Sequence, residues 1–212
     1  MYIPSSFAER DADALFAFIE AHPLAALVTN TPAEGLFATH LPLLIDRAAG
    51  AAGTLFGHVA RANPHARLTG TVDALIIFSG PDAYITPAWY QTKQESGRVV
   101  PTWNYVAVHV YGTLRLRDDP EFLRPHLEAL TRRHESSRPS PWQVGDAPPD
   151  YIAQQMKAIV GVEVIIDRVE GKWKMSQNRS AADVDGVIRG LGESESVQDQ
   201  AVALIVRDRR PQ

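Results

Sequence analysis

The chain contains no cysteine among its 212 residues. This absence excludes a disulfide framework, a zinc site with thiolate ligands, a CxxC redox pair and a cysteine nucleophile. Any redox chemistry would therefore have to come from a cofactor. The lack of cysteine also agrees with a cytoplasmic location, where disulfides are rare.

Long apolar runs and an excess of positive charge are absent as well. No segment approaches the roughly 18 consecutive apolar residues of a membrane-spanning helix, and residues 1–7 do not read as a secretory signal. The 21 Lys and Arg are outnumbered by 25 Asp and Glu, which gives a net charge of -4. We expect a cytoplasmic protein without a membrane segment, and the overall charge gives no basic footprint for nucleic acid.

Familiar catalytic and nucleotide-binding motifs are also missing. The chain has no GxGxxG, no GxxxxGK[ST] and no GxSxG, so neither a dinucleotide fold nor a common hydrolase is indicated. It has seven histidines, but none lies in HExxH or in another spaced pair with a carboxylate partner. We therefore predict no metal site.

Apolar periodicity and turn residues predict short strands with helices at the edges. Helices are expected over 11–22, after Asn63-Pro64, over 119–134 with a kink or a later start at Pro125, and over 150–158, 180–192 and 197–206. Strands are expected over 24–30, 36–45, 54–58, 73–79, 83–86, 105–117 and 161–169, with a hairpin connection at 31–35, a polar surface loop at 88–98 and a turn at Gly171.

This order of elements favours an α+β, mainly β protein built on an antiparallel barrel or sheet. The regular alternation of strand and helix that makes a doubly wound sheet is missing. A chain of 212 residues suits one domain, so we predict a single domain over 1–212 with a helical appendage at about 180–212.

The segment Phe37-Ala-Thr-His-Leu-Pro-Leu43 places Thr39 and His40 inside an apolar strand that also contains Pro42. Proline removes a hydrogen bond of the ladder, so the strand is expected at an edge or a bulge, where free backbone groups can face a ligand. A histidine packed in the core of an edge strand explains the same pattern.

The segment Phe56-Gly-His-Val-Ala-Arg-Ala-Asn-Pro-His65 runs from a strand into a capped helix. Free N–H groups at a helix start, together with Arg61, can hold a phosphate. Alternatively, Asn63 only caps the helix and Arg61 is solvated.

Trp103, Asn104 and Tyr105 stand together where a loop enters an alternating strand. They can form a stacking wall with an amide donor for a heterocycle such as flavin, or an aromatic belt that only packs. A buried Asn104 amide would need partners, and a ligand could supply them.

Near the C-terminus, Lys172, Lys174, Gln177, Asn178 and Arg179 offer donors suited to carbonyl and phosphate groups. A solvated strand end explains them equally well. A third interpretation joins these cations with Arg207, Arg209 and Arg210 in a local basic face for DNA.

Five segments now stand in order along the chain: Met1-Tyr-Ile-Pro4, Thr39-His-Leu-Pro42, Gly57-His-Val-Ala-Arg-Ala-Asn-Pro-His65, Val100-Pro-Thr-Trp-Asn-Tyr105 and Lys174-Met-Ser-Gln-Asn-Arg179. Over nearly its whole length the chain resembles the PaiB family, described as FMN-binding negative transcriptional regulators. That family is similar to the FMN-binding split barrel of pyridoxamine-phosphate-oxidase-like flavoproteins. The resemblance implies a six-stranded antiparallel, Greek-key-like barrel with peripheral helices, and a homodimer with FMN at the subunit interface.

The resemblance also implies which residues bind FMN. Thr39, His40, Leu41 and Pro42 match the strand that lies along the isoalloxazine, and His58, Val59, Ala60, Arg61 and Asn63 match the stretch leading into the phosphate-binding turn. Trp103, Asn104, Gln177, Asn178 and Arg179 match further family motifs. The phosphate turn of the oxidases carries several Ser, Arg and Lys residues, whereas this chain offers mainly Arg61 and Asn63 there.

Three functions follow as alternatives. The first is a dimeric FMN-binding repressor of transcription, with DNA as a further partner. The second is an FMN-dependent oxidoreductase or flavin reductase that uses NAD(P)H, in which the flavin carries hydride. The third is haem handling, for which His40, His58 and His109 are available as ligands.

Overall fold

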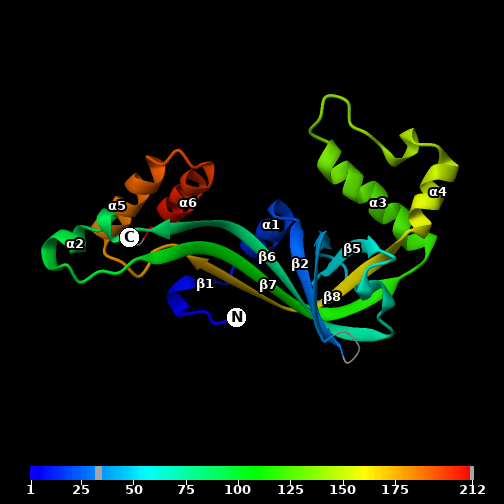
Figure 1. Ribbon diagram of the computed structural model, residues 1–212, viewed down its shortest axis with the longest axis horizontal. Coiled ribbons are helices and arrows are strands. Elements are labelled where there is room, and N and C mark those ends of the chain that lie inside the picture. Colours follow the sequence, from blue (N-terminus) through cyan, green and yellow to red (C-terminus); the bar gives the residue numbers. More distant parts are fainter. Residues whose placement is uncertain (32–34, 211–212) are drawn as a thin grey trace. The chain divides into compact units, whose positions relative to one another are not determined.

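A computed structural model describes residues 1–31 and 35–210, and these divide into two compact units. The first unit contains Met1–Leu15, Ser79–Val108 and Glu170–Gln212, and the second contains Phe16–Phe78 and His109–Val169. Three long strands contribute one part of their length to each unit (Figure 1). They are β6 (Thr71–Ile85), β7 (Thr102–Arg117) and β8 (Ile159–Lys174).

The other elements are shorter. The remaining strands are β1 (Ala8–Glu9), β2 (Leu24–Thr31), β3 (Gly35–Pro42), β4 (Leu44–Asp46) and β5 (Thr54–Ala60). The α-helices are α1 (Ala12–Ala21), α2 (Gln91–Ser96), α3 (Pro120–Glu135), α4 (Pro149–Lys157), α5 (Ala181–Gly192) and α6 (Val197–Asp208), with 3-10 turns at Ser5–Phe7, Pro64–Arg67, Pro87–Trp89 and Val144–Asp146.

The strands follow the order β3-β2-β6-β7-β8-β5-β4, with β1 beside β8. The pairs β2–β3, β2–β6, β4–β5 and β5–β8 are antiparallel, as expected for this α+β chain. The antiparallel pairing of β2 with β3 confirms the predicted hairpin, whose connecting residues 32–34 lie outside the described residues.

Within the second unit, β3 and β5 approach each other although they lie toward opposite ends of the strand order. Gly57 on β5 makes this possible, because a Cβ there would lie 2.7 Å from Leu43 Cδ2 and 3.2 Å from the Pro42 carbonyl oxygen. Only a residue without a side chain allows such a close backbone approach. The sheet therefore curls so that β3 comes near β5, although among the described residues β3 is hydrogen-bonded only to β2.

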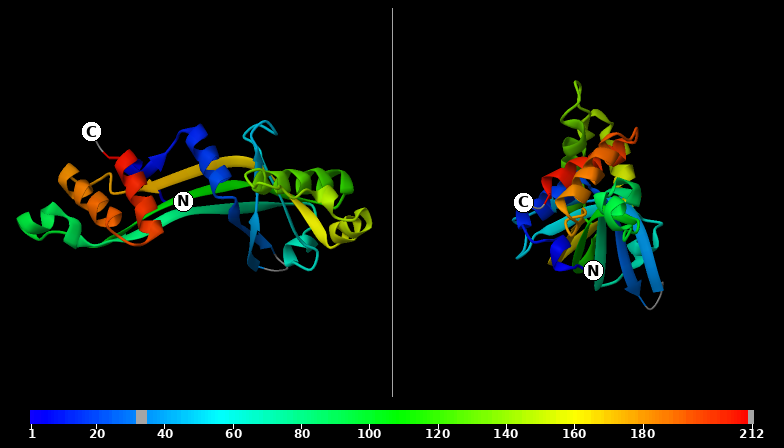
Figure 2. Two further views of the ribbon diagram at one scale, coloured as in Figure 1. Left: turned by 90° about the horizontal axis from the view of Figure 1, so that it is seen from above. Right: turned by 90° about the vertical axis from the view of Figure 1, so that its left-hand side faces the viewer.

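The first unit is organised around the helix pair α5 and α6, which lie side by side (Figure 2). Each helix begins with a serine cap: the Ser180 hydroxyl accepts from the backbone N–H of Asp183, and the Ser196 hydroxyl accepts from that of Asp199. Their buried residues follow helical spacing, with Val184, Val187, Leu191, Val202 and Val206 at or below 1% exposure. The predicted helices over 180–192 and 197–206 are confirmed.

Several local predictions were wrong. The strands predicted at 73–79 and 83–86 form one continuous strand, β6, and the region predicted as a polar loop contains α2. Gly171 does not turn the chain but lies inside β8, where a Cβ would come within 2.2 Å of Leu15 Cδ2. At Pro125 a kink or a later helix start was predicted; the later start is wrong, because α3 begins at Pro120 and includes Pro125, while the kink stays a prediction.

Gly186 and Gly190, one turn apart on α5, let that helix rest on Trp89. A Cβ on Gly186 would lie 1.9 Å from the Trp89 carbonyl oxygen. We predict that Gly186→Ala destabilises the protein by about 1–3 kcal/mol through overpacking. Urea unfolding followed by circular dichroism measures the effect, and Gly192→Ala is the control, because a Cβ there meets nothing within 4 Å. Equal midpoints for the two variants would contradict this packing.

Candidate functional site

The strand β3 is the first component of the candidate site. Among the described residues it has a hydrogen-bonded neighbour, β2, on one side only, which confirms the predicted edge position. Its side chains alternate, so that Leu36, Ala38 and His40 are exposed while Thr39 and Leu41 are at least partly covered. Thr39 and His40, adjacent in sequence, therefore face opposite sides of the strand.

Thr39 faces a hydrogen-bonded cluster centred on His65, which we call the His65 cluster and which also contains Thr29 and Asn63. Thr39 Oγ1 lies 2.7 Å from His65 Nδ1, and Thr29 Oγ1 lies 3.1 Å from His65 Nε2. The Asn63 amide donates to Thr39 Oγ1 at 3.0 Å, and its oxygen accepts from the backbone N–H of His65 at 2.9 Å. Asn63 thus caps the 3-10 turn, as predicted, and also ties it to β3.

His65 is 1% exposed, and burial lowers the pKa of its imidazole. A neutral imidazole has one donor and one acceptor nitrogen, and each ring nitrogen here has a threonine hydroxyl that can take either role. The ring is therefore fully satisfied without charge. Sequence reasoning quoted His65 in a motif but did not assign it a role; its signal was its position two residues after the cap.

Arg61 follows β5 and is occupied by protein groups. Its guanidinium donates to Asp118 at 2.7 and 2.5 Å, to the Lys157 carbonyl at 2.7 Å and to the Ile159 carbonyl at 2.9 Å. With Asp118 it lines one side of a cavity of about 440 Å³ whose other walls include Leu123 and Met156. The predicted contact of Arg61 with a phosphate stays a prediction, and that contact would have to compete with Asp118.

His58 forms a second histidine cluster, with His126 of α3, which the sequence did not predict. His58 Nδ1 lies 3.1 Å from His126 Nε2, and the His126 ring stacks on Phe122 with ring centres 6.0 Å apart. Burial, and then the charge of His58, lowers the pKa of His126 to about 4, and burial also lowers that of His58. Both rings are therefore neutral at neutral pH. Next to His58 on β5, Val59 is buried and Ala60 is exposed.

In the first unit, Trp103 and Asn104 do not form one wall. Trp103 is 49% exposed and donates through its indole N–H to Asp82 at 2.9 Å, whereas Asn104 is fully buried. Successive residues of a strand face opposite sides, so this separation follows from β7 itself. The Asn104 amide donates to Ser176 Oγ at 3.0 Å, so a protein group supplies the partner that a ligand was expected to provide.

The segment after β8 is held as a tight turn by Gln177. Its side-chain oxygen accepts from the backbone N–H of Met175 at 2.7 Å, and its amide donates to the Trp173 carbonyl at 2.6 Å. Ser176 adopts a left-handed conformation with φ of 64°. Gln177 therefore acts on the backbone, while the turn brings Asn178 and Arg179 to the same cavity as Asn104.

We call this cavity the basic cavity; it measures about 90 Å³ and is lined by Phe7, Thr102, Asn104, Lys174, Ser176, Asn178 and Arg179. The Lys174 ammonium donates to Thr102 Oγ1 and to the Trp103 carbonyl oxygen. Arg179 lies over the Tyr90 ring, 4.7 Å from its centre. Of the predicted site residues, the cavity brings together Asn104, Asn178 and Arg179.

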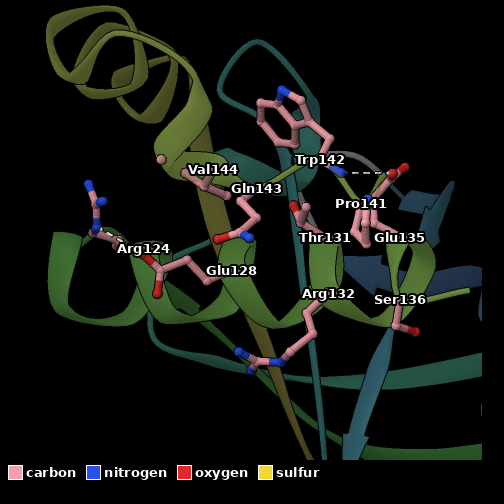
Figure 3. Close-up of a pocket in the computed structure, with 11 residues that line it drawn as sticks. Arg124, Glu128, Thr131, Arg132, Glu135, Ser136, Pro141, Trp142, Gln143 and Val144 are labelled. Atoms are coloured by element: carbon pink, nitrogen blue, oxygen red, sulfur yellow. Dashed lines mark hydrogen bonds and ion pairs between the residues drawn. The ribbon is translucent and has the colours of Figure 1, made fainter. Parts of the chain in front are cut away.

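A wider cavity of about 680 Å³ lies in the second unit between α3 and residues 141–145 (Figure 3). Trp142 and Gln143 come from the connecting segment, opposite Thr131 and Arg132 of α3 (Figure 3). No predicted site residue lines it. Three of its charged groups are already paired, because Arg124 bonds Glu128 at 3.1 Å and Glu135 bonds Arg138 at 3.0 Å.

Two further properties concern residues 1–31 and 35–210 as a whole. Within this part of the chain, no helix is long and apolar enough to cross a membrane. Three or more His, Asp or Glu side chains do not gather in a group that could hold a metal ion anywhere in the same residues.

Comparison with known proteins adds to this geometry. The family described as "Putative FMN-binding domain" matches residues 1–168. An uncharacterized protein of Emericella nidulans is 35% identical over 99% of this chain and 97% of its own length. Protease synthase and sporulation protein PAI 2 of Bacillus subtilis is 31% identical over 99% of this chain and 98% of its own length. The resemblance stated from five sequence segments is thereby confirmed.

Among solved structures, the FAD and heme binding protein from Mycobacterium smegmatis gives a TM-score of 0.55 at 18% identity, covering 79% of this chain and 73% of that one. At this identity the likeness concerns the fold alone. It agrees with the α+β split-barrel fold expected from the sequence.

The His65 cluster generates a first prediction. Thr39→Val keeps the shape of the side chain but leaves His65 Nδ1 buried without its partner, so we expect a loss of about 1–3 kcal/mol in unfolding free energy. Chemical denaturation measures this loss. Thr71→Val is the matched control, since Thr71 is exposed at the start of β6. A Thr39 variant as stable as this control would show that the hydrogen bond contributes nothing.

The pair His58–His126 generates a second prediction. A histidine with a lowered pKa binds fewer protons when folded, so its stabilisation is lost as pH falls from about 6.5 toward the His126 value of about 4. Each such histidine contributes a slope of at most about 1.4 kcal/mol per pH unit. We expect His126→Gln to make the unfolding free energy less dependent on pH in this window. His134→Gln, an exposed change on the same helix, should keep the wild-type slope.

Proposed function

The chain belongs to the FMN-binding domain family, whose cofactor is FMN, and from this premise we propose that it acts as a homodimeric, FMN-binding regulator of transcription. The observation that carries the proposal is the uncovered edge of β3. There, Leu36 is 77% exposed, and Leu24, across the hairpin on β2, is 65% exposed. Leu36 lies on β3, the last strand of the sheet, and Leu24 lies on its neighbour β2, opposite Pro42 at the other end of the hairpin.

An apolar edge strand with free backbone groups invites pairing, and proteins normally cover or charge such an edge. The side chains at the exposed positions of β3 are Leu36, Ala38 and His40, of which only His40 can carry charge. This edge therefore lacks the charged side chains that usually prevent an edge strand from pairing with another chain. A second copy of the chain, together with a flat ligand, would cover the apolar surface and satisfy the backbone groups.

The residues present fit FMN in their chemistry. The exposed side of β3 offers peptide N–H and C=O groups that can pair with the polar edge of a flavin, and Thr39 to Pro42 are the residues we propose to lie along the ring. His58 to Asn63, with Trp103, Asn104 and Gln177 to Arg179, remain the other proposed contacts. Bound FMN would supply hydride and single-electron chemistry, while the chain orients the ring and controls its access to water.

The regulatory part of the proposal is supported by the full-length similarity to the Bacillus subtilis protein named for protease synthesis and sporulation. The charged C-terminal tail gives it little support. Arg209 pairs with Glu9, and Arg210 pairs with Asp185 at 2.7 Å. DNA contact through this tail would have to break both ion pairs, so we propose that regulation depends on the dimer and its FMN instead.

We predict that Leu36→Glu weakens both dimerisation and FMN binding, because it places a charge at the edge of β3 that the second copy and FMN would cover. A loss of about 1–3 kcal/mol corresponds to a decrease of about 5- to 150-fold in each affinity. Light scattering measures the dimer, and the visible spectrum after desalting measures retained FMN. Leu204→Glu on α6 is the control, since Leu204 is 51% exposed but far along the chain from β3. A wild-type monomer that retains FMN would contradict the dimer and leave the cofactor assignment intact.

Regulation and catalysis are separated by two further measurements on the same protein. Selection from random DNA duplexes at low salt should enrich a sequence if the protein is a DNA-binding regulator, with affinity falling as salt rises. Bleaching of the bound flavin by NADH or NADPH would instead favour the FMN-dependent oxidoreductase. No enrichment together with rapid bleaching would overturn the regulatory proposal.

A further inference from the structure

The basic cavity of the first unit lies beside three cations that lack an acidic partner. Lys172, Lys174 and Arg179 form no ion pair with any carboxylate within 4 Å among residues 1–31 and 35–210. Other cations of this unit do find one: the N-terminal ammonium bonds Glu170, and Arg209 bonds Glu9. Within the same residues, Arg189 of this unit is unpaired as well but is exposed, whereas Lys172 and Lys174 are withdrawn from water.

This charge is partly withdrawn from water. Lys172 is 8% exposed and Lys174 is half-buried. Burial, followed by the charges of Lys172 and Arg179, lowers the pKa of Lys174. Lowering of this kind means that the positive form lacks compensation, which an anion would supply.

Neutral protein groups compensate the cations only in part. Lys172 lies 5.0 Å from the centre of the Tyr105 ring, and Arg179 lies over Tyr90. The buried carboxylate of Asp183 accepts from the backbone N–H of Thr92 at 2.9 Å and from its hydroxyl at 2.8 Å, so it is committed elsewhere. Aromatic faces attract cations more weakly than a fully charged partner does.

The cavity itself is small, and all of its lining residues except Phe7 have polar or charged side chains. Its volume of about 90 Å³ corresponds to the space of roughly three water molecules, which suits a single tetrahedral or planar anionic group and is too small for a flavin ring. Asn104 and Ser176 form a buried hydrogen-bonded wall, and Asn178 and Thr102 add further polar side chains. The turn held by Gln177 fixes Ser176 and Arg179 before any ligand arrives.

We propose that the basic cavity is a binding site for a phosphate monoester, with Lys174 and Arg179 as the charged ligands and Asn104, Ser176 and Asn178 as neutral hydrogen-bonding groups. A dianionic phosphate matches the excess of positive charge better than a single carboxylate does. The residues from Lys174 onward lie outside residues 1–168, the part matched by the FMN-binding family. The phosphate can therefore come from FMN or from a separate phosphorylated ligand, and the site goes beyond the proposed function in the second case.

The first test uses inorganic phosphate on the full chain without flavin. We expect phosphate to raise the melting temperature above that in chloride at equal ionic strength, and titration calorimetry to give a matching affinity. Lys174→Gln should weaken phosphate binding by about tenfold or more, and Arg179→Gln should act in the same direction. Arg189→Gln removes an exposed, unpaired charge of α5 and should bind phosphate like the wild type.

The second test identifies the source of the phosphate by comparing FMN with riboflavin, which lacks it. Preferential loss of FMN affinity in Lys174→Gln, with riboflavin unaffected, assigns the cavity to the FMN phosphate. If Lys174→Gln loses affinity for inorganic phosphate but binds FMN and riboflavin like the wild type, the cavity is assigned to a separate phosphorylated ligand. No response of the wild type to phosphate, and an unchanged ratio of FMN to riboflavin affinity in the variant, would overturn the proposal. Failure to bind any flavin would oppose the proposed function but leave the phosphate titration decisive.

Discussion

The close approach of β3 to β5 at Gly57 is the constraint on which the second unit depends. It brings the strand that carries Thr39 next to the residues that follow β5, and so places Thr39 within reach of Asn63 and His65. A side chain at position 57 would force the two strands apart. Gly57 thus contributes to the close approach beside which the 3-10 turn and the edge strand share a hydrogen-bonded cluster.

The arginines and lysines of the candidate site differ in how their charge is compensated. Arg61 is bound by Asp118 and two backbone carbonyls, so its position contributes to structure whether or not a ligand is present. Lys174 and Arg179 have no acidic partner among the described residues. A buried charge without a partner carries a larger desolvation penalty than a paired one. An anion would therefore stabilise the cations of the basic cavity more than it would stabilise Arg61. In the sequence, Arg61, Lys174 and Arg179 are three similar cations, and only the structure shows which of them has an acidic partner.

Sequence periodicity predicted the elements that bury one face against a core, such as α5, α6 and the alternating strand that became β7. It failed where tertiary packing overrides local signals. Gly80 and Pro81 suggested a turn, yet β6 passes straight through them, and Gly171 stays inside β8 because its missing side chain makes room for Leu15. The edge position of β3 followed from Pro42, a residue with a direct physical consequence for the ladder.

The candidate site was predictable in its residues but not in their partners. Thr39, Asn63 and Asn104 were all expected to bind a ligand, and each meets a protein group that is distant in sequence. Thr39 meets Asn63 and His65, and Asn104 meets Ser176. Asn104 also lies on the opposite side of β7 from Trp103, so one sequence motif serves two surfaces. Its buried amide bonds Ser176 in the wall of the basic cavity, while the exposed Trp103 indole bonds Asp82 at the surface. Adjacent residues of this motif can therefore be tested separately, since a change in the amide acts on the cavity and a change in the indole acts on the surface.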